Sequence, residues 1–297
     1  MAHENTQFDV AIIGGGLAGI TAALELLEQG LKIVMIDRDS EQKFGGLATN
    51  SLGGMTLINT PIQRLNGIHD TPETALRDWY SFARFSSRDH WPKKWAELYV
   101  NRSVEDIYQW LKAKGIRFFP VPHWVERGEF GDGNSLPRYH IVWGTGQHLM
   151  HTLINELKHH VNSANIKYLF DSKAESLLIN NRTVCGLQGR HEKTGEAFEV
   201  NAATVLVASG GINGDIDRVK REWDKSWGEP PEHILNGAHE FADGTMHEAV
   251  ERIDGRISNL HQMWNYAAGI HHPKPRVPLE GLSLIPPKSA LWLDATG

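Results

Sequence analysis

The order of apolar and polar segments at the start of the chain predicts a strand, a helix and a second strand. Phe8–Ile13 is a short, mostly apolar run, and a glycine cluster interrupts it. An alanine- and leucine-rich stretch continues to Gly30, and Leu31–Ile36 forms a second apolar run that ends on Asp37. Short buried strands on either side of a helical pattern are typical of a βαβ unit. We therefore expect an α/β fold built on a parallel sheet.

Later segments continue this mixed pattern. Thr71-Pro72-Glu73 predicts a helix start, because proline fits the first turn and an acid favours that end of the helix dipole. Asn180-Asn181 fits a hairpin turn that needs positive φ. Helices are expected over residues 79–85, 93–100, 104–114, 146–160 and 243–254, and strands over residues 167–170, 174–179, 184–190, 197–200, 204–207 and 291–294.

The glycine cluster Gly14–Gly19 has the spacing of a dinucleotide-binding turn. Gly14 suits a tight turn, Gly16 lets the backbone approach a pyrophosphate, and Gly19 lets the helix pack closely on the strand. The helix N-terminus offers unpaired N–H groups to phosphates. Asp37 is placed to accept hydrogen bonds from ribose hydroxyls. An ordinary glycine-rich turn would not require all these parts in register.

Two further glycine clusters favour a flavin dinucleotide over a nicotinamide one. The loop 43–54 contains two glycine pairs, Gly45-Gly46 and Gly53-Gly54, which allow main chain to lie flush against a long, flat cofactor. The apolar run 204–207 leads into Ala208-Ser209-Gly210-Gly211, where a third strand would return to the cofactor. An Asp243-Gly244 pair then opens a helix. A nicotinamide-binding dehydrogenase leaves these later clusters unexplained.

Composition narrows the classes of function. The chain has 297 residues, a formal net charge of −6 and no basic tract, so nucleic acid is not expected as a partner. Its apolar runs are strand-sized, and the first residues lack a signal-peptide pattern, so no membrane association is expected. Cys185 is the single cysteine, which excludes an internal disulfide and suits the cytoplasm. The His159-His160 and His271-His272 pairs lack companion ligands at metal spacing, so no metal site is expected.

These glycine clusters, in this order, resemble the FAD-dependent oxidoreductases of the fumarate reductase, succinate dehydrogenase and ketosteroid dehydrogenase superfamily. The chain is most similar to bacterial ketosteroid-dehydrogenase-like FAD-binding dehydrogenases, and the resemblance covers essentially its whole length. The segments that carry the closer likeness are residues 89–92, 115–120, 134–140, 143–146 and 289–297.

The resemblance implies FAD as cofactor and a set of residues that bind it. In membrane-bound members a histidine bonds covalently to the flavin at the place of Leu47, so FAD is expected to bind non-covalently here. Backbone near Ala174 is expected to meet the adenine. The expected FAD-binding residues are Gly14, Gly16, Leu17, Ala18, Gly19, Asp37, Arg38, Gly45, Gly46, Leu47, Ala48, Ser51, Gly53, Gly54, Ala174, Ala208, Ser209, Gly210 and Asp243.

The fold implied is a Rossmann-like FAD-binding domain, whose parallel sheet carries a β-meander crossover, together with an inserted α+β cap or substrate domain. We expect the FAD-binding domain in residues 1–70 and 144–215, a helical and aromatic cap in 71–143, and the start of a substrate domain in 216–297. In the family this last point lies mid-protein, so the chain is expected to be an N-terminal fragment that holds most FAD contacts and part of the catalytic chamber.

Candidate catalytic residues lie in the cap segment and near the end of the chain. Arg138, Tyr139 and His140 could act as an acid/base or carbonyl-binding group. Equally, Arg138 could pair with a structural carboxylate and His140 could cap a turn. Tyr266 is a further phenol that could polarise a carbonyl, although a packed aromatic is an ordinary alternative. Trp124 and Trp143 lie in irregular segments and could line a slot for a flat, apolar substrate.

The sequence thus predicts an FAD-dependent dehydrogenase that acts on CH–CH bonds beside a carbonyl, with ketosteroid-like compounds as candidate substrates. The expected partners are a small-molecule substrate and an unidentified electron acceptor, and the oligomeric state stays open. One alternative is a fumarate- or enoate-type reductase, for which Arg117, Arg127 and Arg138 are the candidate carboxylate-binding residues. Another is a truncated flavin-binding protein without turnover.

Overall fold

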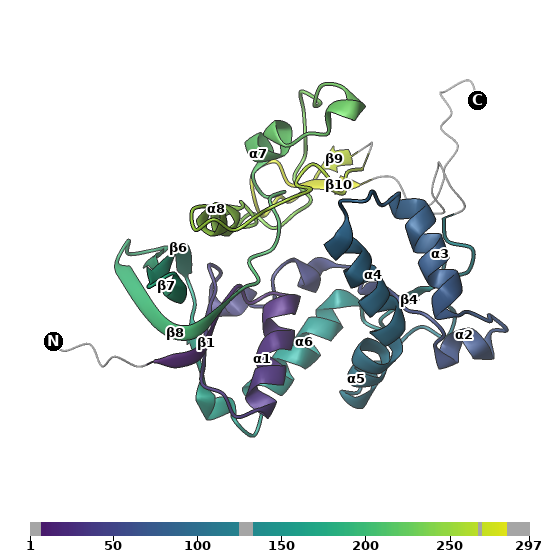
Figure 1. Cartoon of the computed structure of the whole chain (residues 1–297), viewed down its shortest axis with the longest axis horizontal. Coiled ribbons are helices and arrows are strands. Elements are labelled where there is room, and N and C mark those ends of the chain that lie inside the picture. The colour runs from purple at the N-terminus through teal and green to yellow at the C-terminus, as the bar shows by residue number, and fades with distance from the viewer. Residues whose placement is uncertain (1–6, 125–132, 267–268, 284–297) are drawn as a thin grey trace. The chain divides into compact units, whose positions relative to one another are not determined.

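A computed structural model of the chain describes residues 7–124, 133–266 and 269–283. They divide into two compact units (Figure 1). Unit 1 contains the described residues up to Ala48 and those from Leu153 onward, whereas unit 2 contains those between Thr49 and Thr152. The expected strand 291–294 and Arg127 lie outside the described residues.

Unit 1 is built on a six-stranded sheet in the order β5-β2-β1-β8-β7-β6. β5, β2, β1 and the last part of β8 run parallel, while β8, β7 and β6 run antiparallel. The expected α/β class with a mainly parallel sheet is confirmed. The bounds of these strands are β1 (Phe8–Ile13), β2 (Ile33–Ile36), β5 (Ile166–Leu169), β6 (Ser172–Asn180), β7 (Thr183–His191) and β8 (Ala197–Val207).

Strand β8 differs from the sequence prediction. Residues 197–200 and 204–207 were expected to form two strands, but β8 is one continuous strand. Its first part pairs with β7, from Ala197 opposite Arg190 to Asn201 opposite Gly186, and its later part pairs with β1. The segment 167–170 was expected in the meander, yet it belongs to β5 and pairs in parallel with β2. The expectation of two strands was wrong because the polar Asn201 lies on a strand that turns from one partner to the next.

Helices and short strands complete unit 1 around this sheet. α1 follows the first turn and buries Ile20, Leu24 and Leu27. A buried cluster that includes Ala11, Ile36 and Leu187 joins the parallel and antiparallel parts of the sheet with residues of α8. Figure 1 shows α8 beside β6. The bounds are α1 (Leu17–Glu28), η1 (Glu41–Lys43), η4 (Ser163–Asn165), α7 (Ile216–Arg221), η5 (Lys225–Trp227), α8 (Thr245–Glu251), β9 (Gly269–His271) and β10 (Gly281–Ser283).

The turn between β6 and β7 explains its own sequence. Asn180 pairs with Thr183, and the two residues between them, Asn181 and Arg182, have φ of 48° and 63°. Positive φ at both central residues is the conformation of a type I′ hairpin turn. The hairpin predicted here is therefore confirmed, with the turn displaced by one residue.

Unit 2 is largely helical and carries a short antiparallel pair of strands. Thr71 accepts a hydrogen bond from the Thr74 N–H and starts α3 at Pro72, as the sequence predicts. The expected helix 104–114 is a π-helical turn followed by a short α-helix. The bounds are η2 (Leu47–Asn50), β3 (Gly54–Thr56), α2 (Pro61–Leu65), α3 (Pro72–Ala83), α4 (His90–Arg102), η3 (Ser103–Gln109), α5 (Trp110–Ala113), β4 (Tyr139–Ile141) and α6 (Thr145–Lys158), of which η2 and α6 extend into unit 1.

Candidate cofactor site

The turn between β1 and α1 has the geometry that the glycine spacing predicts. Gly14 has φ of 107°, and a side chain there would collide with the carbonyl of Ala208. A side chain at Gly19 would collide with the carbonyl of Gly14, so glycine allows the close approach of α1 to β1. Gly16 differs because a Cβ there would meet nothing within 4 Å. The space beside the start of α1 is therefore open, and α1 has no side-chain cap that would occupy its first N–H groups.

The acid at the end of β2 points back at this turn. Asp37 Oδ2 accepts a short hydrogen bond from the Gly15 N–H, and Oδ1 accepts one from the Asp39 N–H at 2.7 Å. A side chain at Gly15 would collide with Asp37 and with the buried ring of Phe44. Burial raises the pKa of Asp37 although these N–H groups favour its charged form. The carboxylate is thus held beside the glycine turn, where a dinucleotide ribose would be recognised.

The second and third glycine clusters reach the same turn within unit 1. Gly45 and Gly46 have φ of 122° and 61°, and a Cβ at Gly46 would lie 3.2 Å from the Gly16 Cα. The Ala208 N–H donates to the Ile13 carbonyl at 2.8 Å, which places Ala208 and Ser209 against Gly14. Three glycine clusters that are distant in sequence therefore meet at the end of β1.

Arg38 and Asp243, both expected to bind the cofactor, bind each other. Arg38 Nη1 lies 2.7 Å from Asp243 Oδ2, and Arg38 Nε lies 2.6 Å from Glu192 Oε1. The guanidinium also lies over the Phe241 ring, 4.3 Å from its centroid. Asp243 Oδ1 accepts hydrogen bonds from the N–H and the hydroxyl of Thr245, the first residue of α8. Burial disfavours the charged form, but the bonds from Thr245 and Arg38 lower the pKa of Asp243.

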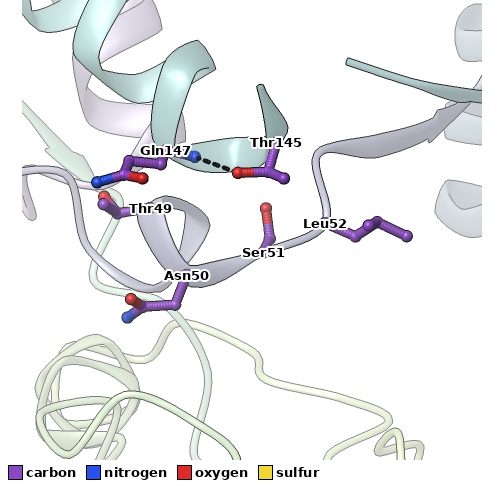
Figure 2. A pocket seen from close by; sticks show the side chains of 6 residues that line it. All are labelled: Thr49, Asn50, Ser51, Leu52, Thr145 and Gln147. Carbon is purple, nitrogen blue, oxygen red and sulfur yellow. Dashed lines mark hydrogen bonds between the residues drawn. The ribbon is translucent and has the colours of Figure 1, made fainter. Parts of the chain in front are cut away.

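Unit 2 contains a polar pocket of about 500 Å³ next to the second glycine pair. Figure 2 shows the side chains that line it: Thr49, Asn50, Ser51, Leu52, Thr145 and Gln147. Thr49 Oγ1 is buried and has no hydrogen-bond partner among the residues that the structure describes. Thr145 has φ of 64°, a strained conformation for a β-branched residue. A buried hydroxyl without a partner and local strain are typical of a ligand site.

Gly53 and Gly54 are explained by protein contacts in unit 2. A Cβ at Gly53 would lie 2.7 Å from the Gly146 nitrogen, at the start of α6. The Gly146 N–H donates to the Ser51 carbonyl at 3.0 Å, and Ser51 Oγ accepts from the Gly53 N–H at 3.2 Å. A side chain at Gly54 would collide with the Tyr139 ring, so the ring of Tyr139 lies over β3. Gly53 therefore allows the loop that contains Ser51 to lie close to the start of α6, and Gly54 allows β3 to lie close to Tyr139.

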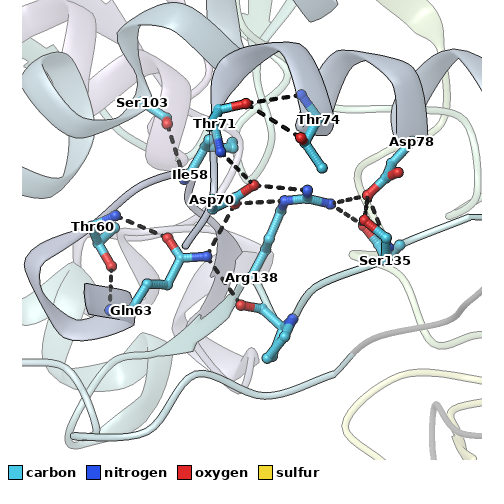
Figure 3. Close-up of polar contacts among 12 residues, drawn as sticks. Ile58, Thr60, Gln63, Asp70, Thr71, Thr74, Asp78, Ser103, Ser135 and Arg138 are labelled. Carbon is cyan, nitrogen blue, oxygen red and sulfur yellow. Dashed lines mark hydrogen bonds and ion pairs between the residues drawn. The ribbon is translucent and has the colours of Figure 1, made fainter. Parts of the chain in front are cut away.

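Arg138 is the centre of a buried ionic network (Figure 3). Its side chain is 2% exposed, and Nε and Nη2 donate to the two oxygens of Asp70 at 2.7 and 2.9 Å. Nη1 donates to Asp78 Oδ2 at 2.6 Å. Burial disfavours the charged form of Asp78, but hydrogen bonds from Ser135 and Arg138 lower the pKa of this carboxyl. Of the two roles weighed for Arg138, this geometry supports the structural ion pair, because its donors point away from solvent.

His140 is also buried and fully engaged. Its Nδ1 donates to the Arg138 carbonyl at 2.7 Å, and its Nε2 lies 2.7 Å from Thr60 Oγ1. Because a carbonyl can only accept, Nδ1 carries the proton and the Thr60 hydroxyl donates to Nε2. Burial lowers the pKa of His140, which keeps it neutral. This arrangement supports a role in packing β4 against α2.

The remaining expected site residues are more scattered. Leu17 and Leu47 are 41% and 45% exposed, Ala18 is exposed, Ala48 lies in η2, and Gly210 lies on a loop of unit 1. The side chain of Ala174 is buried in the core of unit 1, and Ala174 lies opposite Gly189 in the β6–β7 pair. Tyr266 is 50% exposed and stacks on Trp264. Trp124 is partly buried, whereas Trp143 is 53% exposed and contacts Phe119.

Three residues in these sites were given no role from the sequence. Gly15 donates its N–H to Asp37, and a side chain there would collide with Asp37 and Phe44. Asp39 and His239 form an ion pair of 2.8 Å between positions 200 residues apart. The only signal for Asp39 in the sequence was its place two residues after Asp37, at the end of a strand. No local pattern pointed to His239.

Comparison with known proteins gives consistent results. The family described as FAD binding domain matches residues 9–297. A KsdD-like steroid dehydrogenase of Mycolicibacterium smegmatis is 36% identical over 306 residues, which cover 97% of this chain and 55% of that protein. The chain thus spans about half the length of this relative.

Solved structures support the fold. A 3-ketosteroid-Δ4-(5α)-dehydrogenase from Rhodococcus jostii, in complex with 4-androstene-3,17-dione, matches with a TM-score of 0.67 at 20% identity, over 85% of this chain and 55% of that one. A flavocytochrome c3 fumarate reductase matches with a TM-score of 0.68 at 21% identity, over 83% of this chain and 40% of that one. Among residues 7–124, 133–266 and 269–283, no helix is long and apolar enough to span a membrane.

Proposed function

The chain belongs to the FAD binding domain family, and from this membership we propose that it forms the cofactor-binding part of an FAD-dependent dehydrogenase. The proposed reaction removes hydrogen from a CH–CH bond beside a carbonyl, and a ketosteroid-like compound is the proposed substrate. The name of the Mycolicibacterium relative, a steroid dehydrogenase, supports this substrate class. FAD supplies the hydride-accepting flavin when it is bound.

The observation that carries the proposal is the open turn at Gly16. At Gly14, Gly15 and Gly19 a side chain would collide with protein atoms. At Gly16 the space is open, and it lies beside the uncapped N-terminus of α1 and the carboxylate of Asp37. A helix N-terminus binds a pyrophosphate, and a carboxylate at the end of β2 binds ribose hydroxyls. The residues present therefore fit a dinucleotide.

Unit 2 offers groups that fit the polar edge of a flavin ring. Thr49 has an unpartnered hydroxyl, and Asn50, Ser51 and Gln147 add amide and hydroxyl groups around the same pocket. We propose that this pocket binds the flavin, and that the loop from Gly45 to Gly54 carries contacts to FAD. Leucine at position 47 provides no nucleophile, which supports non-covalent binding.

Of the four candidates for acid/base chemistry, the two tyrosines stay as proposed catalytic residues. Arg138 and His140 are buried and engaged in unit 2, so we propose structural roles for both. Tyr139 and Tyr266 remain proposed catalytic residues, since a phenol can donate a hydrogen bond to a substrate carbonyl. The engagement of Arg138 also weighs against a reductase that binds a dicarboxylate. The electron acceptor stays unassigned, and the single Cys185 supports a cytoplasmic location as a proposal.

An absorption spectrum of the purified chain with added FAD tests the cofactor assignment. We expect a yellow protein that releases its flavin into the supernatant after acid precipitation. Gly16→Val should abolish binding by filling the open space while leaving the fold intact. Asp37→Ala should weaken FAD binding by roughly 1.5–3 kcal/mol, because charge-assisted hydrogen bonds to the ribose are lost. Tight flavin retention by the Gly16→Val variant contradicts the proposed site.

Substrate class is tested by turnover with an artificial electron acceptor. Saturated 3-oxosteroids and enoates should be compared in parallel on the FAD-loaded chain. Bleaching of the flavin by the ketosteroid alone supports the dehydrogenase. Oxidation of dithionite-reduced flavin by the enoate alone favours the reductase, and a loaded protein that reacts with neither is a flavin-binding protein without turnover.

A further inference from the structure

The segment just before α8 places a histidine against the acidic loop that follows β2. His239 Nε2 lies 2.8 Å from Asp39 Oδ2, and both residues belong to unit 1. The Asp39 carboxylate is only 4% exposed, whereas the His239 side chain is 25% exposed. A buried carboxylate needs a partner for its charge. His239 is therefore the main group that compensates Asp39.

Asp39 is directly connected to the acid that we assign to the ribose. The Asp39 N–H donates to Asp37 Oδ1 at 2.7 Å, so the backbone of Asp39 holds the Asp37 carboxylate in place. Burial is the main cause that raises the pKa of Asp37; the negative charge of Asp39 raises it too, whereas the Asp39 N–H lowers it. A second negative charge beside Asp37 would also repel the pyrophosphate of a bound dinucleotide.

Few other groups can compensate this charge. Lys43 Nζ lies 4.0 Å from Asp39 Oδ1, but its side chain is 65% exposed and also pairs with Glu240. Arg38 is engaged by Glu192 and Asp243, and it lies over Phe241 rather than over Asp39. Solvent weakens the exposed pair with Lys43. The remaining charges around His239, those of Asp37 and Glu240, are negative.

We propose that His239 is a positioning residue of the FAD site, which compensates the buried charge of Asp39 and thereby keeps Asp37 available to the ribose. This inference rests on the proposed FAD function. Among the described residues His239 makes no hydrogen bond or ion pair with the Gly14–Gly19 turn or with Asp37, so it acts on the cofactor site through its pair with Asp39 and through its charge, which also favours the ionised form of Asp37.

The inference gives FAD affinity a pH dependence. The hydrogen bond with Asp39 raises the pKa of His239 above its ordinary value. Protonation gives up a long contact of 3.3 Å from the Phe241 N–H to Nδ1, but it strengthens the pair with Asp39. Bound FAD brings negative charge, so it should raise the pKa of His239 further, and by linkage the protonated form should bind FAD more tightly. A pKa change of one unit corresponds to about a tenfold change in affinity.

Flavin fluorescence titrations of the full 297-residue chain between pH 6 and pH 9 test this inference. The unchanged chain should bind FAD up to about tenfold more weakly at pH 9 than at pH 6. His239→Leu should bind weakly, with an affinity that is flat across this range. Asp39→Asn added to His239→Leu should recover most of the affinity, since no uncompensated charge remains. His233→Leu is the matched control, because the His233 side chain is 89% exposed and pairs, within the described part of the chain, with its neighbour Glu232 at 3.9 Å.

The outcomes separate this inference from the proposed function. If the unchanged chain binds no FAD at any pH, the proposed function fails. If it binds FAD but His239→Leu keeps the affinity and pH dependence of the control, only the role of His239 is refuted. Failure of Asp39→Asn to restore binding in a folded double variant also refutes it. Circular dichroism checks folding, and His239→Gln, which keeps a donor to Asp39 but cannot be protonated, should bind FAD at an intermediate affinity that does not change with pH.

Discussion

Replacing Arg138 by methionine should destabilise unit 2 strongly. The substitution keeps an unbranched side chain of similar length but removes the three hydrogen bonds that Arg138 donates to Asp70 and Asp78. Asp70 would keep hydrogen bonds from Gln63 and the Thr71 N–H, and Asp78 would keep those from Ser135. Two buried carboxylates would then lack a counterion. Breaking a buried pair in this way costs about 3–5 kcal/mol.

The cost should depend on pH in a defined direction. In the native protein the lowered pKa of Asp78 contributes stability that is present above its unfolded value and lost as the pH falls. Without Arg138, burial should instead raise the pKa of Asp78, so the folded variant takes up a proton more readily. The stability difference between the native chain and Arg138→Met should therefore be larger at pH 8 than at pH 5.

Urea unfolding followed by tryptophan fluorescence measures this difference, since Trp79 lies next to Asp78 on α3 in the core of unit 2. Arg102→Met is the control. Arg102 makes a similar two-pronged pair with Asp106, but both side chains are about half exposed, and solvent should make the loss much smaller. Equal losses for the two variants, or a loss at Arg138 that does not change with pH, would refute the claim that burial makes this network important.

Two further predictions concern stability. Burial keeps His140 neutral, so its contribution to the free energy of unfolding should be present above its ordinary pKa and lost as the pH falls below about 6.5. The urea midpoint should therefore fall over this pH range. In the His140→Gln variant this fall should be smaller. Gly244→Ala should lower the free energy of unfolding by more than the about 1–2 kcal/mol that a left-handed backbone costs by itself, because Gly244 has φ of 79° and ψ of 10° and a Cβ there would also collide with Arg218. A loss of only that size in urea unfolding would contradict a role for Arg218 in packing on α8.

The fold was predictable where local patterns carry enough information. β1, α1 and β2 follow from apolar periodicity and glycine punctuation, and the capped start of α3 follows from Thr71-Pro72. The continuous β8 was not predictable, because its two halves face different partners and Asn201 interrupts the apolar pattern at the change. The π-helical turn Ser103–Gln109 also has no local signature, since its sequence fits an α-helix equally well.

The candidate site shows the same division. The spacing of Gly14, Gly16 and Gly19 predicted the turn at the end of β1, whereas the reason for glycine at position 15 lies in Asp37 and Phe44, which are distant in sequence. Arg138 was ambiguous because its partners Asp70 and Asp78 lie on other elements, and pattern cannot tell whether a cation faces substrate or carboxylates. His239 and Asp39 are paired only by the tertiary fold. Contacts between residues far apart in sequence therefore cannot be predicted from the local patterns of a single sequence.

The register of β1 has a consequence for synthesis of the chain on the ribosome. Val10 pairs with Ile33, which follows closely, and also with Thr204, which is made much later. At about 5–20 residues per second, the second edge of β1 waits roughly 10–40 s for its neighbour to emerge. During that interval an apolar strand with open hydrogen-bonding groups is available to other nascent chains. We expect holding chaperones to protect this strand, so that yield in cells depends on translation speed before residue 207.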